Sequence, residues 1–149
     1  MTVRMDDREV DAFLEEHRTG VLSLLRKDGS PLALPMWFVV LDGHVNIRTR
    51  STSGKATLLE RDPRVCFVVE AGEAWLDLAA VVIRGQAERL EGNEADEVEA
   101  AMAARYASHG VPGDVPKRTR DHYDVELSYY RVVPTTAPLT WRNNKLLRG

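Results

Sequence analysis

The chain has 149 residues, a formal net charge of −3 and 44% hydrophobic residues, which suits one ordinary compact domain with a buried core. The acidic balance gives no global preference for nucleic acids, and the longest apolar runs are too short to span a bilayer. A single cysteine, Cys66, excludes an intrachain disulfide framework and a cysteine-rich zinc site. The acidic N-terminus lacks the layout of a signal peptide, so a cytoplasmic protein is expected.

The first third of the sequence predicts a helix followed by a meander of strands. Residues 6–18 are expected to be helical, because Asp6 and Glu9 suit a capping box and apolar side chains recur at helical spacing. Strands are expected at residues 21–26, 32–41 and 44–50. Asp-Gly pairs at 28–29 and 42–43 suit tight hairpin turns, since both residue types tolerate positive φ. Strands joined in this way predict an antiparallel meander.

The rest of the chain adds further helices and strands. Helices are expected at residues 54–61 and 94–108, with Ser53 and Asn93 as caps. Strands are expected at residues 64–70, 78–90 and 125–133. Between them, residues 111–123 are expected to form a polar, basic loop, and a tail follows from Pro134. The six strands predict a mainly β fold, a small antiparallel barrel with flanking helices, as a single domain over residues 1–149.

The most informative stretch is Ser53-Gly54-Lys55, which follows the strand 44–50 and opens a helix. The first N–H groups of a helix lack internal partners, and the helix dipole adds partial positive charge there. A phosphate group binds readily at such an end. Ser53 adds a hydroxyl, Gly54 permits close approach and Lys55 adds a cation, while Arg48 and Arg50 are expected to close the other side. A capped helix start followed by a lysine is also common where nothing binds, so both interpretations stay open on these residues alone.

The run from Arg50 to Glu70 resembles the central segment of the pyridoxamine-5′-phosphate oxidase-like split β-barrels. The shared features are Ser53, Lys55 and the following element Asp62-Pro63-Arg64-Val65, at the spacing of that family. The preceding meander is similar too, including Pro35-Met36-Trp37-Phe38, so the resemblance covers residues 6–90. It is closest to the branch that uses the deazaflavin coenzyme F420, and it implies a six-stranded antiparallel split barrel.

This resemblance implies a homodimer that holds coenzyme F420 or FMN at the subunit interface, with F420 favoured. The expected activity is hydride transfer between the cofactor and a small unsaturated or aromatic substrate. Ser53 and Lys55 would meet the phosphate, and the second strand would line the ring with its backbone. The full cofactor-binding set implied is Pro35, Met36, Trp37, Thr49, Arg50, Ser53, Gly54 and Lys55. The basic residues of the 111–123 loop are expected either to contact the acidic tail of F420 or to be solvated.

Several alternatives remain beside this interpretation. The strand 32–41 lacks the basic residues of pyridoxamine-phosphate oxidase itself, so oxidation of vitamin B6 is not expected. No catalytic side chain is assigned, and core packing is the commoner role for the tyrosines considered as proton donors, namely Tyr106, Tyr129 and Tyr130. The four histidines lack ligand spacing, so no metal is expected. A flavin- or haem-binding protein without catalysis stays open, whereas a nucleic-acid-binding barrel is disfavoured by the acidic charge.

Overall fold

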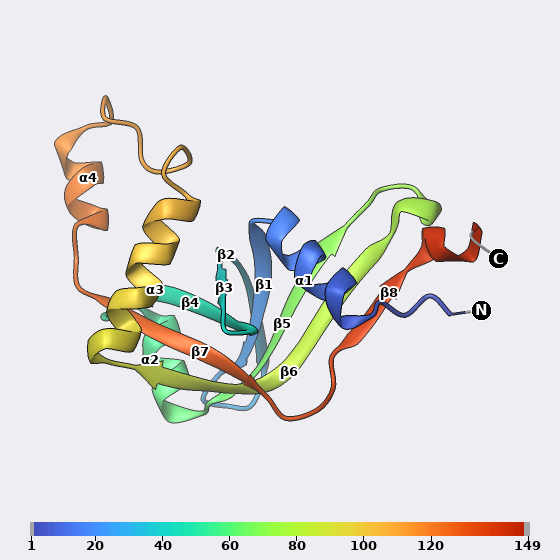
Figure 1. Cartoon of the computed structure of the whole chain (residues 1–149). Helices are drawn as coiled ribbons and strands as arrows, with labels where there is room; N and C mark the ends of the chain where they lie inside the picture. Colours follow the sequence, from blue (N-terminus) through green and yellow to red (C-terminus); the bar gives the residue numbers. More distant parts are fainter. Residues whose placement is uncertain (1, 148–149) are drawn as a thin grey trace.

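Antiparallel strands form the framework of the fold in the computed structural model, which describes residues 2–147 (Figure 1). The strands are β1 (Thr19–Leu25), β2 (Pro31–Trp37), β3 (Val39–Leu41), β4 (His44–Arg50), β5 (Arg64–Ala71), β6 (Ala79–Leu90), β7 (Leu127–Pro134) and β8 (Leu139–Arg142). The helices are α1 (Asp7–Glu16), α2 (Gly54–Arg61), α3 (Gly92–Arg105) and α4 (Lys117–Tyr123), with short 3-10 helices η1 (Trp75–Asp77) and η2 (Asn143–Leu147). The strands form one 8-stranded sheet in the order β2-β1-β5-β6-β7-β4-β3, with β8 paired to β6. The mainly β split-barrel prediction is confirmed, with eight strands in place of six.

The expected strand 32–41 is broken at Phe38 into β2 and β3. Up to Trp37 the chain pairs with β1, whose Thr19 is the register partner of Trp37. From Val39 it pairs with β4, where Asn46 is the register partner of Val39. Both hairpins of the expected meander form, but they do not make one continuous meander, because β1–β2 and β3–β4 lie at opposite ends of the strand order. Because Phe38 joins those two ends covalently, the sheet must curl back on itself.

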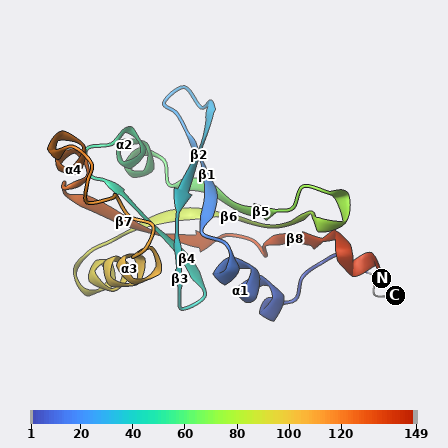
Figure 2. The same ribbon diagram turned by 90° about the horizontal axis from the view of Figure 1, so that it is seen from above.

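The hydrophobic core fills the inside of this curl. Its largest fully buried side chains include Tyr130, Phe13, Phe38, Phe67, Leu22 and Ile47. The rings of Phe38 and Phe67 meet edge to face, with centroids 5.3 Å apart. Helix α1 adds its buried side chains to the core, and Figure 2 shows β5, β6 and β8 running together away from the end of the sheet near α2, α3 and α4. Three of the helices, α2, α3 and α4, thus lie at one end of the sheet (Figure 2).

Local sequence signals set most element boundaries correctly. The capping box of α1 forms as predicted, with Asp6 and Glu9 each bonding the other's backbone N–H. The predicted helix 54–61 and its cap Ser53 are confirmed. The Asp42-Gly43 turn has positive φ at both residues, 50° and 76°, as a two-residue hairpin turn of this kind requires. These features depend on residues close together in the sequence.

Three other predictions are wrong. The cap of α3 is Glu91 rather than Asn93, because Gly92, with a φ of 60°, turns the chain out of β6 and begins the helix earlier. The expected loop 111–123 contains α4, whose exposed turn is supported by an ion pair between Lys117 and Asp121 at 2.9 Å. The expected tail contributes β8, which extends the sheet along β6. No helix within residues 2–147 is long and apolar enough to cross a membrane.

Candidate functional site

Hydroxyl groups gather where β4 ends and α2 begins. Ser53 Oγ accepts the backbone N–H of Ala56 at 3.1 Å and so caps α2. Thr49 Oγ1, near the end of β4, lies 3.1 Å from Ser53 Oγ. Ser128 on β7 donates its hydroxyl to Ser51 Oγ at 2.9 Å. The β4–β7 pairing explains this arrangement, since Ser128 is the register partner of Thr49.

Two basic side chains accompany these hydroxyls, and neither has a carboxylate partner. Within residues 2–147, no aspartate or glutamate lies within ion-pair distance of Lys55 or Arg50. Lys55 is half-buried. Its pKa lies below the usual value, first because burial disfavours the ammonium and second because Arg50 repels it. Arg50 Nη1 lies 3.4 Å from Nδ1 of His122 on α4. This set is called the base cluster below: Thr49, Arg50, Ser51, Ser53, Lys55, His122 and Ser128.

The start of α2 is open above the base cluster. A Cβ atom built on Gly54 would meet nothing within 4 Å. In the described part of the chain, the backbone N–H groups of Gly54 and Lys55 have no hydrogen-bond partner, whereas that of Ala56 is capped by Ser53. Two free N–H donors, unpaired cations and nearby hydroxyls form the donor set that a phosphate requires. The residues present therefore fit a phosphate-bearing group.

Arg48 does not join the base cluster, contrary to expectation. Its Nη1 pairs with Glu99 Oε2 on α3 at 2.6 Å, and the Tyr129 hydroxyl donates to the same oxygen at 2.8 Å. Burial alone would raise the pKa of Glu99, but the hydrogen bonds from Arg48 and Tyr129 bring it below the usual value. Burial, followed by the bond to Glu99, raises the pKa of Tyr129 to about 12. Arg48 is thus a structural partner of α3.

The expected ring-lining residues Pro35, Met36 and Trp37 lie on β2, an edge strand that approaches β4. Pro35 is exposed, whereas Met36 packs against the core. The Trp37 ring stacks on Tyr106, with centroids 4.4 Å apart and planes 8° apart. A cavity of about 480 Å³ lies elsewhere, between the N-terminal segment and β8. Pro35 is thus the exposed member of this segment, whereas Met36 and Trp37 are partly buried.

The remaining candidate groups are occupied by structural contacts. The Tyr130 hydroxyl donates to Glu60 at 2.9 Å, and burial, then this bond, raises the pKa of Tyr130 to about 12. On α4, Lys117 pairs with Asp121, and Arg120 donates to the Gly113 carbonyl at 3.0 Å. In residues 2–147, no three His, Cys, Asp or Glu side chains gather as a metal site would require.

The curled sheet that splits at Phe38, together with a phosphate-compatible start of α2 after β4, defines a split β-barrel protein. Residues 6–140 match the family model described as pyridoxamine 5′-phosphate oxidase, and the chain belongs to this family. No match was found among curated proteins.

Solved structures extend the comparison. The crystal structure of the conserved hypothetical protein Rv2991 from Mycobacterium tuberculosis has 33% sequence identity, with 97% of this chain and 89% of that chain covered and a TM-score of 0.81. A FAD-binding protein from Mesorhizobium loti has 18% identity, with 93% and 94% covered and a TM-score of 0.70. HutZ, a haem storage protein from Vibrio cholerae, has 16% identity, with 95% and 96% covered and a TM-score of 0.72. The last two show a shared fold.

Proposed function

We propose that this chain is an oxidoreductase that transfers a hydride between coenzyme F420 or FMN and a small unsaturated or aromatic substrate. The observation that carries the proposal is the base cluster, where Lys55 and Arg50 lack carboxylate partners in the described residues beside the open start of α2. Unbalanced like charges next to free N–H donors are typical of an anion site. Family membership makes a cofactor phosphate the best-supported anion.

Each residue of the proposed set has a binding or orienting role. Ser53, Gly54 and Lys55 would hold the phosphate, with Thr49 and Arg50 beside it. Pro35, Met36 and Trp37 would present their backbone to the ring and keep water from it. A bound flavin or deazaflavin supplies the hydride chemistry itself. The chain therefore needs no side-chain nucleophile. This agrees with the hydrogen bonds that already engage the hydroxyls of Tyr106, Tyr129 and Tyr130.

An apolar row on the outer face of the sheet supports a homodimer with the cofactor at its interface. Each member is in register with the next across β2, β1, β5, β6 and β8: Pro35, Val21, Val68, Val82 and Leu139. None of them is buried, and Leu139 is 51% exposed. A contiguous exposed apolar surface of this kind marks an interaction site. Since Pro35 begins the ring-lining segment, a second copy packed here would cover that segment, and sedimentation of the purified chain tests the dimer.

A second candidate function is binding of a flavin or haem without catalysis. The fold is shared with a FAD-binding protein and with a haem storage protein. The specific observation in its favour is that two of the tyrosines considered as proton donors are committed, because the hydroxyls of Tyr129 and Tyr130 are bonded to glutamates. On this alternative, the chain binds its ligand tightly and turns over no substrate.

Parallel titration separates these candidates. Purified protein is titrated with FMN, coenzyme F420 and haem, and binding is followed by fluorescence or absorbance. Micromolar or tighter binding of FMN or F420, followed by substrate reduction with the reduced cofactor, is the expected result. Binding without turnover across a panel of unsaturated and aromatic acceptors favours the second candidate. Absence of binding to both FMN and F420 contradicts the proposed oxidoreductase.

A further inference from the structure

The break between β2 and β3 leaves buried backbone groups without a strand partner. The chain pairs with β1 up to Trp37 and with β4 from Val39, so Phe38 itself belongs to neither ladder. Phe38 is fully buried. Buried backbone N–H and C=O groups need hydrogen-bond partners. Something outside the sheet must therefore satisfy the backbone at the point where the barrel splits.

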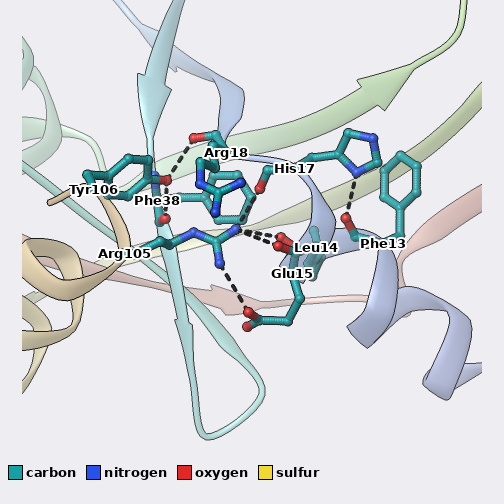
Figure 3. Close-up of polar contacts among 8 residues, drawn as sticks. All are labelled: Phe13, Leu14, Glu15, His17, Arg18, Phe38, Arg105 and Tyr106. Carbon is teal, nitrogen blue, oxygen red and sulfur yellow. Dashed lines mark hydrogen bonds and ion pairs between the residues drawn. The ribbon is translucent and has the colours of Figure 1, made fainter. Parts of the chain in front are cut away.

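Tyr106, the residue that ends α3, supplies that partner (Figure 3). The backbone N–H of Phe38 donates to the Tyr106 hydroxyl at 3.0 Å. The carbonyl oxygens of Phe38 and of Arg18, which immediately precedes β1, lie 2.5 Å and 2.7 Å from the same hydroxyl. Its single hydrogen serves one of these carbonyls at a time. One phenol thus joins the split point to the start of β1.

The neighbouring Arg105 holds this end of α3 in place. Its Nη2 donates to the carbonyl oxygens of Leu14 at 3.0 Å and His17 at 2.6 Å, at the end of α1 (Figure 3). Its Nη1 pairs with Glu15 at 3.0 Å. The guanidinium is nearly buried and lies 5.4 Å from the centre of the Phe38 ring. The Tyr106 hydroxyl is therefore presented to Phe38 from a fixed support.

We infer that Tyr106 is a positioning residue for the segment Pro35-Met36-Trp37, which the proposed function assigns to the cofactor ring. Two contacts transmit its position: the hydroxyl holds the backbone of Phe38, and the ring stacks on Trp37. The base cluster lies on β4, α2, β7 and α4, and none of its hydrogen bonds in the described residues involves Tyr106. Tyr106 therefore sets the ring side of the site and leaves the phosphate side unaffected. This inference rests on the proposed function.

The test compares two probes on Tyr106→Phe, which removes the hydroxyl and keeps the stacked ring. FMN binding should weaken about fivefold, the effect of one lost hydrogen bond on the segment, whereas binding of inorganic phosphate should stay within about twofold of wild type. The matched control is Tyr130→Phe, which removes another buried phenol hydroxyl, bonded to Glu60. It should lower Tm, and any change in affinity should be the same for FMN and for inorganic phosphate. An equal loss for both probes in Tyr106→Phe overturns the inference.

Amide hydrogen exchange supplies a readout that needs no ligand. In Tyr106→Phe, exchange should rise in residues 36–40 relative to α2 and β7, and in Tyr130→Phe it should not rise there selectively. If wild type binds neither FMN nor F420, the proposed function is wrong, and with it the assignment of the segment to a ring. The exchange result then still decides whether Tyr106 holds the segment. Unchanged exchange in residues 36–40 shows that it does not.

Discussion

Arg48 and Arg50 lie on the same strand with one residue between them, yet their surroundings are opposite. Arg48 is paired under α3 with Glu99, which also accepts the Tyr129 hydroxyl. Arg50 has His122 as its nearest partner and lies beside Lys55, with no carboxylate within ion-pair distance among residues 2–147. The first region balances its charges within the chain. The second leaves positive charge unbalanced next to free backbone donors.

The difference between the two regions separates a structural role from a binding role. Like charges held close together destabilise a folded chain slightly, so an arrangement of this kind favours an external anion. A balanced and partly buried cluster gains nothing from a ligand and contributes only to folding. The two regions therefore predict opposite responses: mutations in the base cluster should change binding, and mutations under α3 should change stability.

The largest expected effect is that of Lys55→Ala on cofactor binding. The dissociation constant for FMN or F420, whichever wild type binds, should rise roughly 10- to 100-fold, because a charged contact to phosphate contributes about 1.5–3 kcal/mol. The free energy of unfolding should change by about 0.5 kcal/mol or less, as for most surface substitutions. Fluorescence titration and urea unfolding measure the two quantities. Lys27→Ala is the matched control, since it removes an exposed lysine elsewhere and should leave both unchanged.

A Lys55→Ala protein that binds cofactor as tightly as wild type would contradict the phosphate assignment. A loss of stability as large as the loss of binding would contradict the binding role assigned to the base cluster, because the cluster would then be structural.

The next effect is on stability. Glu99→Gln should lower the free energy of unfolding by about 1 kcal/mol, a modest value because the Glu99 side chain is 41% exposed. Cofactor affinity should stay within about twofold of wild type. Urea unfolding as a function of pH gives the measurement. Binding weakened as strongly as in Lys55→Ala would show that the α3 region belongs to the ligand site.

The pH dependence of this stability difference follows from the two pKa shifts. The pKa of Glu99 is lowered from 4.5, so its contribution is present above pH 4.5 and is lost as the pH falls through the folded-state pKa. The pKa of Tyr129 is raised from 10.0 to about 12, so its contribution is complete below pH 10 and is lost as the pH rises toward 12. The difference between wild type and Glu99→Gln should therefore be largest between these limits. A constant difference at all pH values would show that the charge of Glu99 is irrelevant.

The sequence could predict those parts of the fold that depend on neighbouring residues. The capping box of α1, the bounds of α2 and the two Asp-Gly hairpins follow from local rules and are confirmed. The break at Phe38 could not be predicted, because residues 32–41 form an apolar run whose one proline, Pro35, lies three residues before the break. The hydroxyl that satisfies the backbone at the break belongs to Tyr106, which lies 68 residues away in the sequence. The strand β8 was missed for a similar reason, since only β6 gives it a partner.

In the candidate site too, residues close together in the sequence could be predicted and residues brought in from distant segments could not. Ser53 and Lys55 could be found from the helix-start pattern, and the structure brings Thr49 and Arg50 to them. Ser128 and His122 were missed, because strand pairing and α4 bring them in from distant parts of the sequence. Ser51 could have been found from the run Ser51-Thr52-Ser53. Arg48 was placed with the cluster because it alternates with Arg50 on β4, and a single strand pattern does not reveal Glu99 on α3.

The smallest expected effect comes from Gly54→Ala at the open start of α2. The φ of Gly54 lies outside the left-handed region, and its new Cβ would meet no atom within 4 Å. The free energy of unfolding should therefore stay the same or rise by about 0.5 kcal/mol, since alanine favours the helical state more than glycine. Cofactor affinity should nevertheless fall about threefold, because the added methyl group occupies space next to the backbone N–H donors that would reach the phosphate. A variant that is more stable and binds equally well would show that the ligand does not approach the start of α2, even if Lys55 binds it from the side.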